Sequence, residues 1–182
     1  KDIFKFTEVN GTVPLVQGGM IHQFDSEFAP PQRWVSISDA RSRVASKSQD
    51  PDQILPYQDY RIAHRRISSS TNARTMIVCI LPPMRFCADT AQTVKNLIPH
   101  PVSLCITGLL NSYVVDYELR QRVTQHCDMH FVYALHVPRL TENDPQFHPI
   151  VQRAAKLICT TPEFDDLARE VGHLDVRVAQ QV

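Results

Sequence analysis

The residues best suited to chemistry gather near the middle of the chain. Several arginines lie among apolar residues over 60–67, and a serine-rich bend follows at 68–72. A guanidinium can pair bidentately with phosphate or with the edge of guanine, and an asparagine amide can pair with adenine. Serine and threonine hydroxyls bond phosphate oxygens. These residue types predict a surface for an anionic partner, with the candidate residues Arg61, His64, Arg65, Arg66, Ser69, Ser70, Asn72 and Arg74.

The charge that supports this prediction is local. The 182-residue chain has 19 basic and 19 acidic residues, so its bulk field attracts neither nucleic acid nor a membrane. Between residues 41 and 74, however, seven basic residues accompany three acids, which indicates a local anionic partner. The alternative is that acids elsewhere in the fold balance these cations. In that case Arg61 and Arg74 form internal ion pairs with Asp59 or Asp116.

Two strands are expected to position the candidate residues. Residues 60–67 form a basic strand candidate, and residues 75–81 form an almost wholly apolar one that ends at Pro82-Pro83. Asn72 suits a left-handed turn position between them. A basic strand beside a buried strand would hold its cations rigidly.

The rest of the N-terminal part predicts strands and loops. A turn at Asn10-Gly11 precedes a strand candidate at 13–16, a weaker one lies at 20–25, and a better one at 33–37. Residues 39–52 hold too few apolar side chains to bury a face, so they are expected to form an exposed loop.

The C-terminal part reads mainly as helices. The apolar spacing over 102–123 predicts two helices divided near Asn111, with Ser112 as the N-cap of the second. Residues 129–135 form an apolar strand candidate, and 145–159 an amphipathic helix. Thr161 is expected to cap a last helix, which Gly172 closes.

This order of elements predicts an α+β fold, with a small mixed or antiparallel sheet in the N-terminal two-thirds, helices packed on it and a helical C-terminal part. We expect one domain over 1–182, mainly strands and loops over 1–100 and mainly helices over 101–182. Because the sequence starts at a lysine and ends abruptly, we expect it to be a fragment of a longer chain.

The motifs favour a binding module over a complete enzyme. The sequence has no Gly-rich phosphate loop, no H-E-x-x-H and no G-x-S-x-G, so we name no catalytic residue. His126 and His130 are four apart with Cys127 between them, yet no second ligand cluster follows, and no metal is expected. Five cysteines without a C-x-x-C pair indicate reduced, buried thiols in a cytoplasmic protein. No apolar run is long enough for a membrane span, and no membrane partner is expected.

Several phrases of the sequence together resemble one family. Residues 18–25 are similar to a G-K-M-I-H-Q-F-D phrase, although Gly19 stands where the family phrase usually has lysine. Further matching phrases follow in order over most of the chain, roughly from Pro14 to Gly172: Tyr60-Arg61-Ile62-Ala63 with Arg65, Thr71-Asn72, Arg74-Thr75, Leu81-Pro82-Pro83, Leu110-Asn111-Ser112, Asp116, Arg120-Gln121 and Val137-Pro138. They resemble the region after the catalytic domain in large adenine-specific DNA methyltransferases of restriction-modification and phage-defence systems. Type IIG restriction enzymes, whose specificity domains are grouped with the C-terminal domain of the Taq methyltransferase, are among them.

The resemblance implies a target-recognition domain that binds duplex DNA. In the family, a separate domain of the same chain binds S-adenosylmethionine, carries an N-P-P-Y type motif and methylates an adenine flipped from the duplex. This chain has no N-P-P-Y, so it is expected to be non-catalytic alone and to need no cofactor of its own. Phosphate contacts would come from the basic strand and from the serine-rich loop with Arg41, Arg43 and Lys47.

A second hypothesis remains open. The shared phrases would then serve a protein-interaction or scaffold domain that docks on the methyltransferase domain without base contacts. A third, an unrecognised hydrolase, would need a cleft with perturbed titratable groups.

Overall fold

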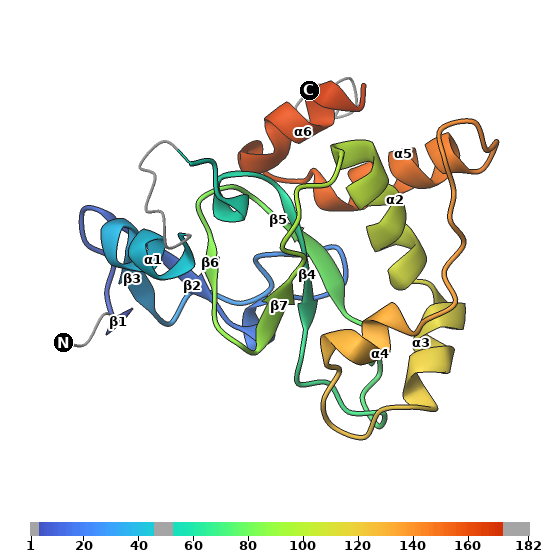
Figure 1. Ribbon diagram of the computed structural model, residues 1–182, viewed down its shortest axis with the longest axis horizontal. Helices are drawn as coiled ribbons and strands as arrows, with labels where there is room; N and C mark the ends of the chain where they lie inside the picture. Colours follow the sequence, from blue (N-terminus) through green and yellow to red (C-terminus); the bar gives the residue numbers. More distant parts are fainter. Residues whose placement is uncertain (1–3, 46–52, 173–182) are drawn as a thin grey trace, which may run out of the picture.

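The computed structural model describes residues 4–45 and 53–172, and these form an α+β fold with two small sheets and helices in the C-terminal part (Figure 1). The predicted fold class is confirmed. The sequence suggested one sheet, whereas the strands divide between two.

The first sheet has the order β1-β3-β2-β6. Its strands are β1 (Phe4–Lys5), β3 (Trp34–Ser36), β2 (Thr12–Val16) and β6 (Phe86–Cys87), and only the β2–β6 pair is parallel. Gly11 adopts a positive φ of 78° in the turn before β2, as the Asn10-Gly11 pair predicts.

Helix α1 (Ile37–Val44) follows β3 directly and corrects the loop predicted over 39–52. The Ser36 hydroxyl accepts the Asp39 amide at 3.5 Å, so a side-chain cap starts the helix. The helix buries only Ala40, which explains why its apolar pattern was too weak to recognise. Residues 46–52 of the predicted loop lie outside the described part of the chain.

The second sheet carries the basic strand. Strand β4 (Arg61–Arg65) lies between β5 (Val78–Leu81) and β7 (Ala91–Thr93), and both pairs are antiparallel. All four residues of β5 are buried, so the predicted pairing of a basic strand with a buried strand is confirmed.

Helices pack against this second sheet. Helix α2 (His100–Leu110) packs against both β5 and α5 (Phe147–Ile158), and α3 (Tyr113–Arg120) follows α2 after a sharp turn (Figure 1). Ser112 caps α3 as predicted, because its hydroxyl accepts the Val115 amide at 3.3 Å. The main core joins β4 and β5 to these helices through Ile62, Ile80, Leu104, Leu119, Phe147 and Ile158.

Helix α4 (Met129–Tyr133) stands where an apolar strand was predicted over 129–135. Short apolar runs do not distinguish a strand from a buried helical turn by their period. Here the amides of Phe131 and Ala134 bond to carbonyls three residues earlier, so the segment satisfies its own backbone without a partner strand.

The last helical segment begins at η3 (Pro162–Phe164), continues as α6 (Asp165–Glu170) and closes at Gly172, whose φ is 70°. The predicted start at Thr161 is confirmed in position, although the Thr161 hydroxyl makes no capping bond.

None of the five cysteines is in a disulfide; four of them are buried, and Cys87 is half-buried. Among the described residues, no helix is long and apolar enough to cross a bilayer. Nor do the described residues gather a cluster of three metal-ligating side chains.

The two glycines of η1 (Gly18–Met20) give a matched stability test. A Cβ at Gly18 would collide with the Thr90 carbonyl oxygen, whereas a Cβ at exposed Gly19 meets no atom within 4 Å. Gly18→Ala should lower the free energy of unfolding by about 1–3 kcal/mol, because main chain must move to relieve the overlap. Gly19→Ala should change it by less than about 0.5 kcal/mol. Urea denaturation of both variants checks this, and equal costs would refute the close packing of η1 against residue 90.

Candidate nucleic-acid interface

The arginines of β4 turn inward and bind main-chain carbonyls. Arg65 Nε donates to the Gly18 carbonyl at 2.7 Å, and its Nη2 donates to the Ile21 carbonyl. Arg61 Nη2 donates to the Arg85 carbonyl, while its buried Nε finds no hydrogen-bond partner within residues 4–45 and 53–172. Burial lowers the pKa of both guanidinium groups. These two cations therefore fasten the sheet to neighbouring loops.

The other two basic residues of this stretch are also engaged. His64 is buried with Nε2 2.8 Å from the Cys127 carbonyl, and burial lowers its pKa, so the ring is neutral at pH 7. Arg66 pairs with Asp128 and Asp89, each at 2.6 Å. The hydrogen bond and charge of Asp128, helped by Asp89, raise the Arg66 pKa.

Three further cations were predicted to contact phosphate from the loop expected over 39–52, and the structure treats each differently. Arg41 bonds to the Gln53 carbonyl at 2.8 Å and to the Gln58 side chain at 3.2 Å. Arg43 is exposed and meets no hydrogen-bond or ion-pair partner within the described residues. Lys47 lies outside the described residues.

The bend at 68–74 is held from beneath by one guanidinium. Arg120, on α3, donates to the carbonyls of Ser70 at 3.2 Å, Asn72 at 2.7 Å and Ala73 at 2.6 Å. The Ser69 hydroxyl bonds to Thr71 at 2.8 Å within the bend. The bonds from Arg120 therefore fix the backbone of the bend. Residues 71–73 are exposed, so the Thr71 and Asn72 side chains face solvent.

Asp116 holds both Arg120 and the strand that leaves the bend. Its buried carboxylate accepts the amides of Thr75 and Met76, each at 2.7 Å, and Arg120 Nε at 2.8 Å. Burial alone would raise the Asp116 pKa, but the two amides and the guanidinium outweigh it and hold this pKa below its usual value. The carboxylate is therefore charged at pH 7 and fully bonded.

Asn111 provides a second junction at the end of α2. Its side chain exchanges two hydrogen bonds with Val78, donating to the carbonyl at 2.8 Å and accepting the amide at 3.1 Å. Gln23 Nε2 donates to the same side chain at 3.2 Å, and Arg74 Nη2 donates to the Asn111 carbonyl. Arg61 and Arg74 thus both bond to carbonyls, rather than to the acids Asp59 and Asp116 as the balanced-charge alternative suggested.

Helix α3 adds exposed aromatic residues beside the bend. Tyr113 and Tyr117, one turn apart, are 83% and 68% exposed, and Val114 is 78% exposed. The Arg74 guanidinium lies 4.2 Å from the centre of the Tyr113 ring, a cation–π contact that leaves the other ring face open. We define the bend face as Ser69, Ser70, Thr71, Asn72, Arg74, Tyr113 and Tyr117.

Four of the predicted residues meet on the bend face, namely Ser69, Ser70, Asn72 and Arg74. The cations of β4, by contrast, lie within the frame behind it. Sequence reasoning missed the tyrosines because their helical spacing was read as part of a core pattern. The spacing held a signal, since Tyr113 and Tyr117 are four residues apart and share one face of α3, away from the side that buries Val115 and Leu119.

Comparison with known proteins adds no relative: no family model, curated protein or solved structure matches the chain.

Asp116 gives a direct test of this network. Asp116→Asn should lower the free energy of unfolding by about 3 kcal/mol, because it leaves Arg120 and two backbone amides without a charged acceptor. Asp166→Asn is the matched control: its pair with Arg169 is exposed, so the change should be under about 0.5 kcal/mol.

The loss of stability caused by Asp116→Asn should also depend on pH. Since the native Asp116 pKa is depressed, its contribution is complete above the unfolded carboxyl value of about 3.9 and is lost as the pH falls further. The difference in stability between wild type and Asp116→Asn should therefore narrow in acid. A cost that is unchanged with pH would contradict a charged Asp116.

Proposed function

We propose that this chain is the DNA target-recognition domain of an adenine-specific DNA methyltransferase from a restriction-modification or phage-defence system. It binds duplex DNA and positions the target adenine for a separate catalytic domain of the same chain, which uses S-adenosylmethionine. On this proposal the cofactor site and the catalytic groups belong to that separate domain. The parent protein works in the cytoplasm.

One observation carries the proposal: the phrases that resemble the methyltransferase family meet in one bonded network. Gln23 belongs to the phrase at 18–25, Arg74-Thr75 is one of the matches that follow, and Asn111, Asp116 and Arg120 belong to the matches over 110–121. Hydrogen bonds join these residues. Matches scattered by chance along 182 residues have no reason to converge in this way. The network also leaves a rigid polar bend exposed, which supports a recognition surface.

In this proposal the bend face contacts DNA, and the arginines of β4 hold the fold in place. Asn72 and Thr71 offer side-chain donors and acceptors to bases or phosphates, and Tyr113 offers a flat ring face. Arg61 and Arg65 serve as positioning residues, because their guanidinium groups are occupied by carbonyls. Arg43, on α1, is exposed and unpaired among the described residues, so it offers a second phosphate contact away from the bend face.

A second candidate function rests on α3. Tyr113, Val114 and Tyr117 form an exposed apolar strip of the kind that another protein domain covers. In this reading the domain docks on the methyltransferase domain through α3 and makes no base contacts.

Selection from a randomised duplex library at low salt tests the proposal. The wild-type chain should enrich a defined sequence, and Thr71→Ala/Asn72→Ala should bind the enriched duplex about tenfold more weakly because base or phosphate contacts are lost. Lys156→Ala, which removes an exposed cation of α5, is the control and should bind as wild type does. Absence of any duplex binding would overturn the proposal.

The same duplex separates the two candidate functions. If α3 only docks on a protein domain, Tyr113→Ala/Tyr117→Ala and Thr71→Ala/Asn72→Ala should both leave duplex affinity unchanged. Loss of affinity in the bend variant alone would keep DNA recognition and assign α3 to docking. Thermal melting of each variant confirms that folding is intact, since these side chains are exposed.

A further inference from the structure

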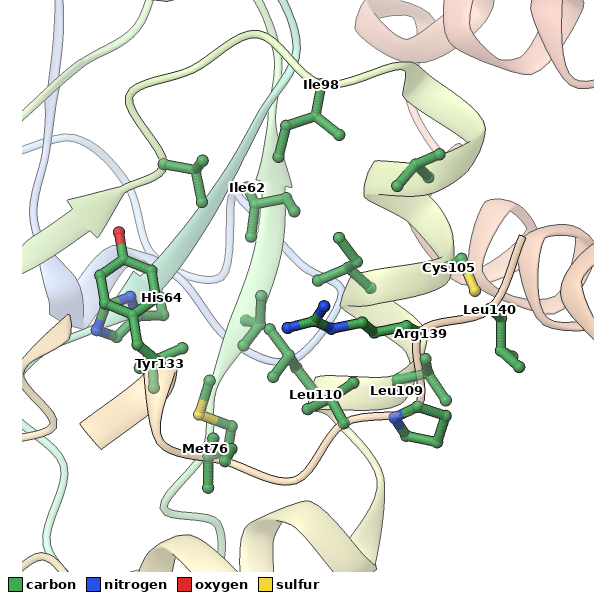
Figure 2. A pocket seen from close by; sticks show the side chains of 18 of the residues that line it. Ile62, His64, Met76, Ile98, Cys105, Leu109, Leu110, Tyr133, Arg139 and Leu140 are labelled. Carbon is green, nitrogen blue, oxygen red and sulfur yellow. The ribbon is translucent and has the colours of Figure 1, made fainter. Parts of the chain in front are cut away.

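An apolar cavity of about 490 Å³ lies between the second sheet and the helices, away from the contacts that define the bend face (Figure 2). Its floor is formed by Ile62 and Val78 of the sheet, and its walls by α2, α4 and residues 135–140. Its size falls within the range of small-molecule pockets, roughly 300–1,000 Å³. The cavity is therefore large enough for a ligand.

Two basic side chains line this cavity, and they differ in whether they can bind a ligand. His64 is committed to the Cys127 carbonyl at 2.8 Å. Arg139 has no hydrogen-bond or ion-pair partner within the described residues, and Figure 2 shows its guanidinium extended over the cavity between Leu110 and His64. None of the described lining residues is acidic. The site thus combines an apolar interior with one unpaired positive group at its opening.

This combination selects the chemical class of the ligand. An apolar interior excludes a polar or multiply charged molecule, because its polar groups would lose water without gaining partners. One guanidinium pairs well with one carboxylate, bidentately. At roughly 30 Å³ for each water-sized atom, the cavity admits at most about 16 non-hydrogen atoms.

We propose that this cavity binds a medium-chain carboxylate, with its hydrocarbon tail among the side chains of α2 and the sheet and its carboxylate on Arg139. Decanoate, with about 12 non-hydrogen atoms, matches the volume. The proposal does not rest on DNA recognition, since it uses none of the residues of the bend face.

The four methionines provide a test with internal controls. Met76 and Met129 line the cavity, whereas Met20 and Met84 lie outside it. In the chain labelled with ¹³C at the methionine methyl groups, decanoate added below its micelle concentration should shift the Met76 and Met129 resonances saturably and leave the other two in place. No shift, or equal non-saturating shifts of all four, would overturn the proposal.

Variants then test the role of Arg139. Arg139→Gln should weaken decanoate binding by about tenfold and change decanol binding by less than about twofold, because only the carboxylate uses the charge. Arg153→Gln is the matched control on α5, where Arg153 is exposed and bonds only to its own helix, and it should bind both ligands as wild type does.

A cavity-filling variant checks the position of the tail. Ile106 is a half-buried residue of α2 that lines the cavity. Ile106→Phe should weaken the binding of decanoate and of decanol alike, because the larger side chain reduces the free volume of the cavity. Equal binding of decanoate by wild type and Arg139→Gln would refute the assigned carboxylate site. Unchanged binding by Ile106→Phe would refute the assigned tail site.

Discussion

The buried carboxylate of Asp116 is the constraint on which the rest of the bend face depends. A charge out of water must be matched by donors, and Asp116 finds three: two successive backbone amides and one guanidinium. Because the amides belong to Thr75 and Met76, the carboxylate fixes where the chain enters β5. Because the guanidinium is that of Arg120, it also fixes the bend, whose carbonyls Arg120 binds.

The same need to satisfy buried polar groups explains the basic strand. Arg61 and Arg65 lie between a buried strand and neighbouring loops, and their guanidinium groups donate to the loop carbonyls of Gly18, Ile21 and Arg85. A guanidinium suits this role because its donors spread in a fixed plane. The residues that look most like nucleic-acid contacts in the sequence thus join the two sheets, and the exposed side chains lie one bend further along.

Much of the frame was predictable, because it follows local patterns. The β4–β5 pair, the cap at Ser112 and the helix over 145–159 each rest on apolar spacing or on a single capping side chain. The bend face was less predictable, since the direction of Arg61 depends on a loop 24 residues away in the chain and that of Arg65 on residues 44 and 47 positions away. Likewise the apolar run at 129–133 suits a strand or a helix by its period, and the structure forms a helix there through the short-range backbone bonds of Phe131 and Ala134.

Amide hydrogen exchange of the chain, with and without a duplex at low salt, tests the central claim most directly. The account predicts that DNA slows exchange in the bend at 69–74 and in α3, while β4, which is already bonded between two strands, exchanges as before. Protection confined to β4, or no protection of the bend at a DNA concentration that saturates binding, would contradict it.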